Sequence, residues 1–131
     1  MVKSGQVELV EGGIVQPDEA TTNYADVLRN FEAGHDWLME IFGVKPKVAW
    51  QLDPWGHSSV QAQIFAELGM ESVYFARMNR YFKQEMQGKK ALEFIWQPTF
   101  ADGDYGAHRE IFAHCHYTHY NPMGGLNFMD R

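Results

Sequence analysis

The sequence has little cysteine, little basic charge and no long apolar run, and each shortage excludes a class of protein. Cys115 is the single cysteine, so no internal disulfide can form. Lys and Arg total 11 against 17 Asp and Glu, giving a formal net charge of −6, which argues against a nucleic-acid partner. No stretch approaches the roughly 20 apolar residues of a membrane-spanning helix. The N-terminal residues also lack the apolar centre of a signal peptide.

Two common kinds of catalytic motif are missing as well. The glycine pairs at 12–13 and 124–125 have neither a following Lys-Ser/Thr nor a G-x-G-x-x-G pattern, so they do not predict a phosphate-binding loop. No serine or cysteine stands in a nucleophile elbow.

Aromatic residues, by contrast, are abundant, at 15% of a chain that is 45% apolar. The length of 131 residues is that of one ordinary domain with a packed core, and nothing in the sequence divides it in two. Four tryptophans suit a carbohydrate or another planar ligand, but they can equally fill the core. They are Trp37, Trp50, Trp55 and Trp96.

Hydrophobic periodicity and turn residues predict alternating strands and helices. Strands are expected at residues 7–10, 47–52, 72–76 and 92–96. Helices are expected from an entry at 17–20 to Gly43, from Ser58 or Ser59 to Gly69, and over 78–86, where Gly88 ends the last one. Residues 110–116 fit either a strand or a short helix.

This order of elements predicts an α/β fold with a parallel sheet and βαβαβ connectivity. The strand at 47–52 has almost no polar alternation, as expected for a strand covered on both faces. Four strands are too few for an eight-stranded (β/α) barrel, which takes roughly 250 residues. They are enough for a small open sheet or for one arc of a barrel.

Asp53 is the main candidate for chemistry because it follows the strand at 47–52 directly. A carboxylate at the carboxyl end of a parallel strand is a frequent catalytic position, although Asp before Pro also commonly caps a turn. Arg77 follows the next expected strand and could face Asp53, holding its carboxylate ionised, or could be an ordinary surface arginine. Trp55 could offer a flat face to a sugar or pack over the sheet edge.

A cluster of histidines offers a competing hypothesis. In a strand, His114 and His116 would lie on one face, a spacing that metal sites use, with His108 and His119 close by in sequence. Cys115 would point to the opposite face, and a structural zinc site needs four ligands. These residues therefore fit polar loop histidines better than a zinc site.

The segment Asp53-Pro-Trp-Gly-His-Ser58 resembles the Asp-Pro-Phe-Gly-His-Ser signature of glycoside hydrolase family 38, the zinc-dependent retaining α-mannosidases. Other segments share the likeness: residues 6–13, 18–24, 42–50, 75–77 and 92–96. The resemblance is strong over residues 6–97 and weaker beyond Pro98. It implies that residues 1–131 form a single partial domain, an incomplete portion of a parallel (β/α) barrel-like catalytic domain.

The resemblance also implies roles for individual residues. Asp53 matches the family's catalytic nucleophile, which is also a ligand of one active-site Zn²⁺. Trp55 matches an aromatic residue that lines the mannose site, and Arg77 matches an arginine beside the nucleophile; both are implied to bind substrate. The implied reaction is hydrolysis of terminal α-linked mannose from glycans with retention. A lysosomal, vacuolar or secretory-pathway location is implied for the family.

Several parts of that site are expected to lie outside this chain. The family holds zinc with a His-x-Asp pair, which occurs nowhere in the sequence. Retaining hydrolysis needs two carboxyl groups about 5 Å apart, and the resemblance assigns one. The chain alone is therefore expected to be inactive and to need the remaining segments of the barrel. Two alternatives are a non-catalytic truncated fragment and a small metal-binding module built on the histidines.

Overall fold

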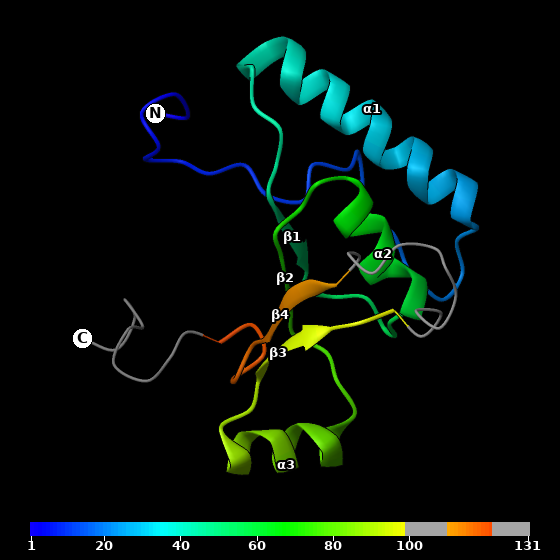
Figure 1. The fold of residues 1–131 in the computed structure, drawn as a ribbon, viewed down its shortest axis with the longest axis vertical. Helices are drawn as coiled ribbons and strands as arrows, with labels where there is room; N and C mark the ends of the chain where they lie inside the picture. Colours follow the sequence, from blue (N-terminus) through cyan, green and yellow to red (C-terminus); the bar gives the residue numbers. More distant parts are fainter. Residues whose placement is uncertain (99–109, 122–131) are drawn as a thin grey trace.

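A computed structural model describes residues 1–98 and 110–121, which form a mixed α/β domain (Figure 1). The elements in chain order are α1 (Tyr24–Phe42), β1 (Val48–Gln51), α2 (Ser59–Glu67), β2 (Ser72–Phe75), α3 (Arg80–Lys89), β3 (Glu93–Trp96) and β4 (Ile111–Cys115). Residues 110–116, which fitted either a strand or a helix, thus form a strand. No helix in the described ranges is long and apolar enough to cross a membrane.

Helix α1 begins later than the expected entry at residues 17–20. Asn23 is its N-cap and accepts a hydrogen bond from the main-chain N–H of Asp26 at 3.0 Å, whereas Asp18 closes a separate turn with Thr22. The predicted end is confirmed: Gly43 adopts a left-handed conformation (φ 67°), and its N–H donates to the Met39 carbonyl.

The strand predicted at residues 7–10 does not form. One backbone hydrogen bond joins this segment to β1, from Glu11 N–H to the Val48 carbonyl at 2.7 Å. Beyond it, the Glu11 carboxylate accepts the Trp50 N–H that the carbonyl of a neighbouring strand would otherwise take. Glu11 is also in the left-handed region (φ 62°), so the chain turns before a ladder can continue.

The shorter helices follow the expected positions more closely. Ser58 caps α2, whose buried side chains include Ile64 and Phe65. Asn79 caps α3 by accepting two main-chain N–H groups. The prediction that Gly88 ends α3 is wrong, because the helix continues through it to Lys89 and stops at Lys90, which adopts a left-handed conformation.

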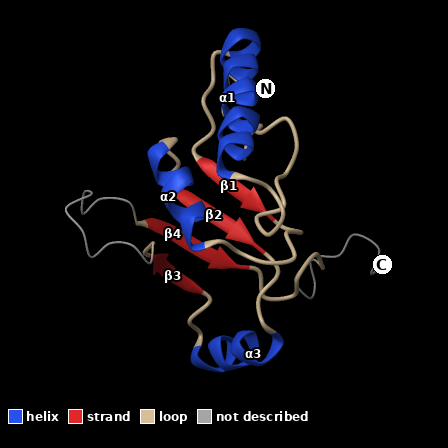
Figure 2. Ribbon diagram, turned by 90° about the vertical axis from the view of Figure 1, so that its right-hand side faces the viewer, coloured by secondary structure: helices blue, strands red, loops and turns tan. Residues whose placement is uncertain are grey.

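The sheet has the order β1-β2-β4-β3 (Figure 2). Strands β1, β2 and β4 are parallel, but β3 pairs antiparallel with β4 at the edge, so the expectation of an all-parallel sheet is wrong there. Strand β3 alternates exposed Glu93 and Ile95 with half-buried Phe94 and Trp96, a pattern typical of an antiparallel edge strand. The result is a four-stranded, mostly parallel sheet.

The two faces of the sheet differ in their covering. Helices α1 and α2 pack on one face, where Phe31 meets Phe65 edge-to-face at 5.7 Å above Ala49, Val73 and Ala113. On the other face a row crosses the sheet in register, made of Trp50, Tyr74, His114 and Glu93. Trp50 and Tyr74 stack with ring centroids 5.9 Å apart. Next to this row Ile95 and Phe112 stay exposed, so the described residues leave part of this face open.

Candidate functional site

The topology brings Asp53 and Arg77 to the same edge of the sheet. Strands β1 and β2 are parallel neighbours, and their last residues, Gln51 and Phe75, are register partners. Asp53 and Arg77 each lie two residues beyond these partners, so both follow the carboxyl ends of adjacent strands. This is the edge at which parallel α/β folds place their sites.

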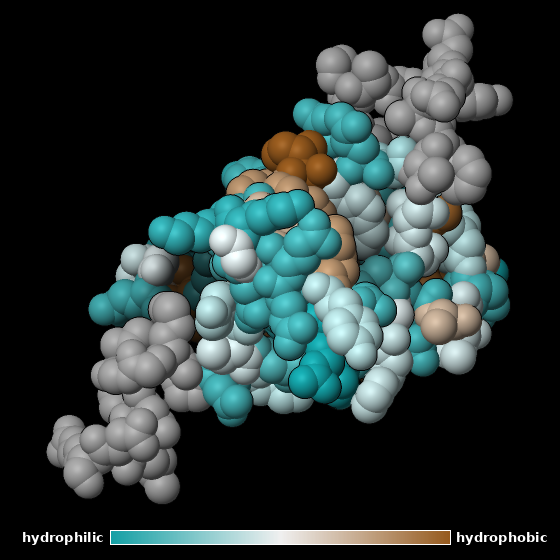
Figure 3. Space-filling view, turned by 90° about the horizontal axis from the view of Figure 1, so that it is seen from below, coloured by the Kyte–Doolittle hydropathy of each residue, from teal (hydrophilic) through white to brown (hydrophobic). Residues whose placement is uncertain are grey.

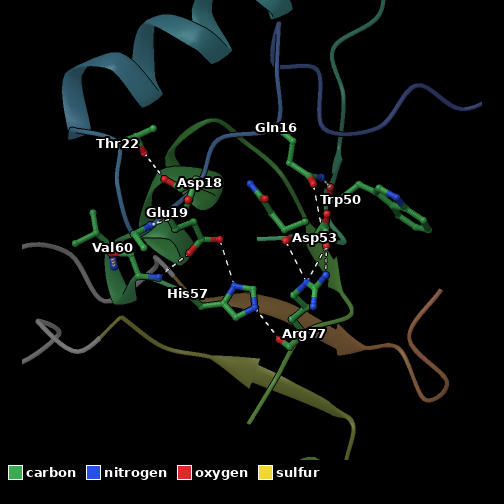
Figure 4. Close-up of polar contacts among 12 residues, drawn as sticks. Gln16, Asp18, Glu19, Thr22, Trp50, Asp53, His57, Val60 and Arg77 are labelled. Carbon is green, nitrogen blue, oxygen red and sulfur yellow. Dashed lines mark hydrogen bonds and ion pairs between the residues drawn. The ribbon is translucent and has the colours of Figure 1, made fainter. Parts of the chain in front are cut away.

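Arg77 (Figure 4) and Tyr120 both bond to one oxygen of the Asp53 carboxylate and fix its position. Arg77 donates to Asp53 Oδ1 from Nε at 2.8 Å and from a second guanidinium nitrogen, and its Nε also reaches the Asp53 carbonyl at 3.2 Å. The Tyr120 hydroxyl donates to the same Oδ1. The Tyr120 hydrogen bond and the Arg77 guanidinium lower the pKa of Asp53. Within the described residues Oδ2 accepts no hydrogen bond, so one ionised oxygen is left for chemistry.

Trp55 stands over the same arginine. Its side chain is 77% exposed, and the Arg77 guanidinium carbon lies 3.8 Å from the centroid of the indole ring. This is a cation–π contact. Trp55 is therefore an exposed side chain that stacks on Arg77 at the sheet edge. Ser58 rather than Asp53 is the N-cap of α2, so Asp53 does not cap that helix.

His57 connects the Asp53–Arg77 pair to a buried carboxylate. Its Nε2 lies 2.9 Å from the Arg77 carbonyl and its Nδ1 lies 3.2 Å from Glu19 Oε1. Both partners are acceptors, so only the doubly protonated imidazole donates to both. Burial lowers the pKa of His57, but Glu19 and the Arg77 carbonyl outweigh it and leave the pKa raised. The other Glu19 oxygen accepts the Ser58 N–H at 2.6 Å, which fixes the loop after Asp53.

A second buried carboxylate lies beneath this loop. Glu11 accepts from Gln51 Nε2 at 2.8 Å and from the Trp50 N–H, and burial raises its pKa to about 7. Gln16 bonds to the Trp50 carbonyl and accepts the Asp53 N–H at 3.4 Å. The N-terminal segment therefore holds the end of β1 through side chains rather than through a sheet ladder.

The structure brings together all three predicted site residues, Asp53, Trp55 and Arg77. It adds Tyr120 and Glu19, which sequence reasoning missed. Tyr120 lies 67 residues from its partner in a region with weak patterning, and Glu19 was interpreted as the start of a helix. No local spacing indicates either contact.

The histidines do not form a metal site in the described part of the chain. His114 lies in β4 rather than in a loop and bonds to Glu93 at 2.8 Å, with the His116 ring 5.5 Å away. Within residues 1–98 and 110–121, no group of three or more His, Cys, Asp or Glu side chains could hold a metal ion. His108 lies outside the described residues.

The lack of three clustered metal ligands among the described residues also applies to a zinc site at Asp53. The free Oδ2 fits one metal ligand, but zinc takes three or four protein ligands. Glu11 and Glu19, the carboxylates bonded around this loop, accept main-chain N–H groups instead. The described residues alone therefore do not fit a zinc site.

Comparison with known proteins gives consistent matches. The model of the glycosyl hydrolases family 38 N-terminal domain matches residues 1–129. The chain is 42% identical over 129 residues to an alpha-mannosidase of Canavalia ensiformis, covering 98% of this chain and 13% of that protein. It is 37% identical to the lysosomal alpha-mannosidase of Dictyostelium discoideum over 128 residues, covering 98% of this chain and 12% of that protein. It is 35% identical to alpha-mannosidase 2 of Homo sapiens over 114 residues, covering 87% of this chain and 10% of that protein. The chain thus spans 10% to 13% of the length of these relatives.

Proposed function

This chain belongs to glycosyl hydrolase family 38, and from that membership we propose that it supplies the nucleophile segment of an α-mannosidase active site. The substrate is a glycan with terminal α-linked mannose, cleaved with retention of configuration. Asp53 is the nucleophile, and Trp55 and Arg77 bind the sugar. The observation that carries this proposal is the Asp53 carboxylate, held at Oδ1 by Arg77 and Tyr120 with Oδ2 free.

The arrangement around Asp53 suits nucleophilic attack on a sugar. Its lowered pKa keeps the carboxylate ionised, and the two donors fix its orientation. Oδ2 forms a bond to the anomeric carbon as the bond to the leaving oxygen breaks, and a second carboxyl group protonates that oxygen. Water then cleaves the glycosyl ester and returns Asp53 as a carboxylate. The exposed indole of Trp55 lies beside this position and offers the sugar a flat apolar surface.

The second carboxyl group has no candidate among the carboxylates bonded around the loop. Glu11 and Glu19 are tied to main-chain N–H groups and serve structure. The general acid is therefore proposed to come from another part of a longer protein. The parallel strands β1, β2 and β4 fit one arc of a larger (β/α) barrel that would contain it.

Zinc is proposed as the cofactor of the complete site, with the Asp53 carboxylate group as one ligand and the others from outside this chain. When bound, zinc acts as a Lewis acid that orients oxygen ligands of the substrate. Because this chain provides one ligand and one of two carboxyl groups, we propose that it is inactive alone.

The test compares Asp53→Asn with Asp26→Asn in a protein that contains this segment and the rest of the catalytic domain. Asp53→Asn should lower kcat on a synthetic α-mannoside by on the order of 10³-fold or more. Asp26 is exposed on α1 and pairs with Arg29, so its replacement should leave kcat unchanged. A fluorinated mannosyl fluoride that traps the intermediate should label Asp53, and label on another residue would contradict the role.

The 131-residue chain provides the second test. It should release no mannose from the same α-mannoside with or without added Zn²⁺. Zinc-dependent release by the pure chain would show that the site is complete here and that the proposed division of the site is wrong.

A further inference from the structure

A cavity beside the Asp53 site is lined by basic side chains. It lies between the loop after β2, one face of α3 and residues 117–119. Four of its lining residues can carry positive charge: Arg77, Arg80, Lys83 and His119. No aspartate or glutamate of the described residues lines it. The chain has a net charge of −6, so a group of cationic side chains with no acid among them makes this part of the surface locally positive.

The contacts of these side chains leave positive charge available. Arg80 makes no hydrogen bond or ion pair in the described part of the chain. Lys83 donates to the Ala76 carbonyl at 2.9 Å, which holds its ammonium group near the loop but does not neutralise it. The acid of α3, Glu85, lies outside the cavity and pairs with Lys89 at 2.5 Å.

The cavity is built rather than a chance gathering of surface side chains. Gln87 donates to the Tyr117 carbonyl at 2.9 Å, which ties α3 to the 117–119 segment across the cavity. Asn79 already caps the first N–H groups of α3, so any anion here would be bound by side chains and not by the helix end. Figure 3 views the molecule from the α3 side and shows a mainly hydrophilic surface there.

Arg77 links this cavity to the proposed reaction site. Arg77 lines the cavity, and its guanidinium bonds to Asp53 and, at 3.3 Å, to the Tyr120 hydroxyl. A ligand that reaches from Asp53 past Arg77 would enter the cavity. A sugar at Asp53 could therefore extend a substituent toward Arg80 and Lys83.

We propose that this cavity binds the phosphate group of a phosphorylated mannose, with Arg80 and Lys83 as its main ligands. Guanidinium and ammonium groups are the side chains that bind phosphate oxygens most strongly. The position of the sugar rests on the function proposed above, whereas the binding of phosphate itself does not.

The test uses the 131-residue chain and isothermal titration calorimetry with inorganic phosphate, mannose 6-phosphate and mannose. Mannose 6-phosphate should bind more tightly than inorganic phosphate. Arg80→Gln should weaken both phosphate ligands about tenfold, because a charged hydrogen-bonding partner is lost. Lys89→Gln is the matched control: it removes a charge from the same helix outside the cavity and should leave both affinities within about twofold.

Each outcome decides part of the proposal. Absence of saturable phosphate binding, or equal losses in Arg80→Gln and Lys89→Gln, would overturn it, provided that circular dichroism shows both variants folded. If mannose 6-phosphate binds no better than inorganic phosphate, the cavity holds a free anion and the assignment to a sugar substituent is wrong. None of these measurements requires catalysis, so failure of the nucleophile test would leave the phosphate site intact.

Discussion

At the scale of single residues, the main feature is that Arg77 and Tyr120 share one oxygen of Asp53. A carboxylate held by two donors on the same oxygen keeps its other oxygen free while remaining ionised. Arg77 is itself stacked on Trp55, and its carbonyl is bonded to His57. The orientation of Asp53 therefore depends on side chains from three separate segments.

Tyr120→Phe should raise the pKa of Asp53, because the largest contribution to its lowering is the Tyr120 hydrogen bond. Arg77→Met should raise it in the same direction. The measurement is an NMR titration of the Asp53 carboxyl carbon in the 131-residue chain. Tyr117→Phe is the control, because within the described residues the Tyr117 hydroxyl makes no hydrogen bond to Asp53 or Arg77. Equal pKa values in Tyr120→Phe and the parent chain would contradict this assignment.

The sequence predicts part of this residue-scale arrangement. The proximity of Asp53 and Arg77 could be predicted because each follows a predicted strand, and parallel strands end at one edge. The contact of Tyr120 with Asp53 could not be predicted, nor could those of Glu19 with His57 and Ser58. These contacts depend on how segments distant in sequence meet in the fold. Periodicity gives the direction of a side chain within an element and gives no information on loops that meet in space.

At the scale of elements, a close backbone approach joins α1 to the turn at Gly12-Gly13. A Cβ added at Gly34 would lie 1.9 Å from the Gly12 carbonyl oxygen, so only glycine lets this turn lie against the helix. The contact helps to place Glu11, whose carbonyl also bonds to His35 at 3.0 Å. A glycine that weakens α1 locally thus serves the packing of the N-terminal segment.

Gly34→Ala should therefore destabilise the chain by roughly 2 to 3 kcal/mol through overpacking, despite the better helix propensity of alanine. Gly88→Ala is the matched control within α3: its Cβ would meet nothing within 4 Å, and the change should stabilise by up to about 1 kcal/mol. Urea unfolding followed by circular dichroism measures both. A neutral or stabilising Gly34→Ala would show that the turn moves away from α1 without cost.

Whether a helix or strand could be predicted depends on how clear its sequence pattern is. Helices α1 and α2 were predicted because their apolar residues recur at helical spacing, and strands β1, β2 and β3 because each is a short apolar run bounded by turn residues. The failures have local causes: the Glu11 side chain replaces a strand at residues 7–10, and β3 runs antiparallel at the sheet edge. Strand direction depends on the path between elements, which composition does not encode.

At the scale of the whole molecule, the buried ionisable groups favour folding at mildly acidic pH. The pKa of Glu11 is about 7 in the folded chain against an ordinary value of 4.5, so the folded state binds the proton more tightly. Stability from this group is fully present below pH 4.5 and falls as pH rises to about 7. His57, whose pKa is raised, loses its contribution as pH rises above 6.5. Asp53, whose pKa is lowered, acts oppositely, losing its contribution as pH falls below 3.8.

Glu11→Gln should remove the Glu11 part of this dependence. The amide still accepts the Trp50 N–H without a charge to bury, so at pH 8 the variant should be more stable than the parent by up to about 3 kcal/mol. Near pH 4.5 the two should differ little. Urea unfolding at a series of pH values measures this, with Glu8→Gln, an exposed neighbour, as the control. A parent and variant with parallel pH profiles would show that Glu11 is not the group responsible.

The open sheet face is the other molecular-scale feature. The described residues cover the row from Trp50 to Glu93 only in part, and Ile95 and Phe112 are exposed beside it. An apolar sheet face without cover favours association. This fits a chain that forms part of a larger domain, and it also fits the alternative of a non-catalytic fragment, which the activity tests above distinguish.

The bond between Tyr120 and Asp53 also has a consequence for the time course of synthesis. A ribosome adds about 5 to 20 residues per second, so the 67 residues that separate the two take roughly 3 to 13 s to make. During that interval the nascent chain can pair Asp53 with Arg77 but cannot close the second bond. The Asp53 carboxylate therefore acquires its second hydrogen-bond donor only after the strands that carry Asp53 and Arg77 have been made.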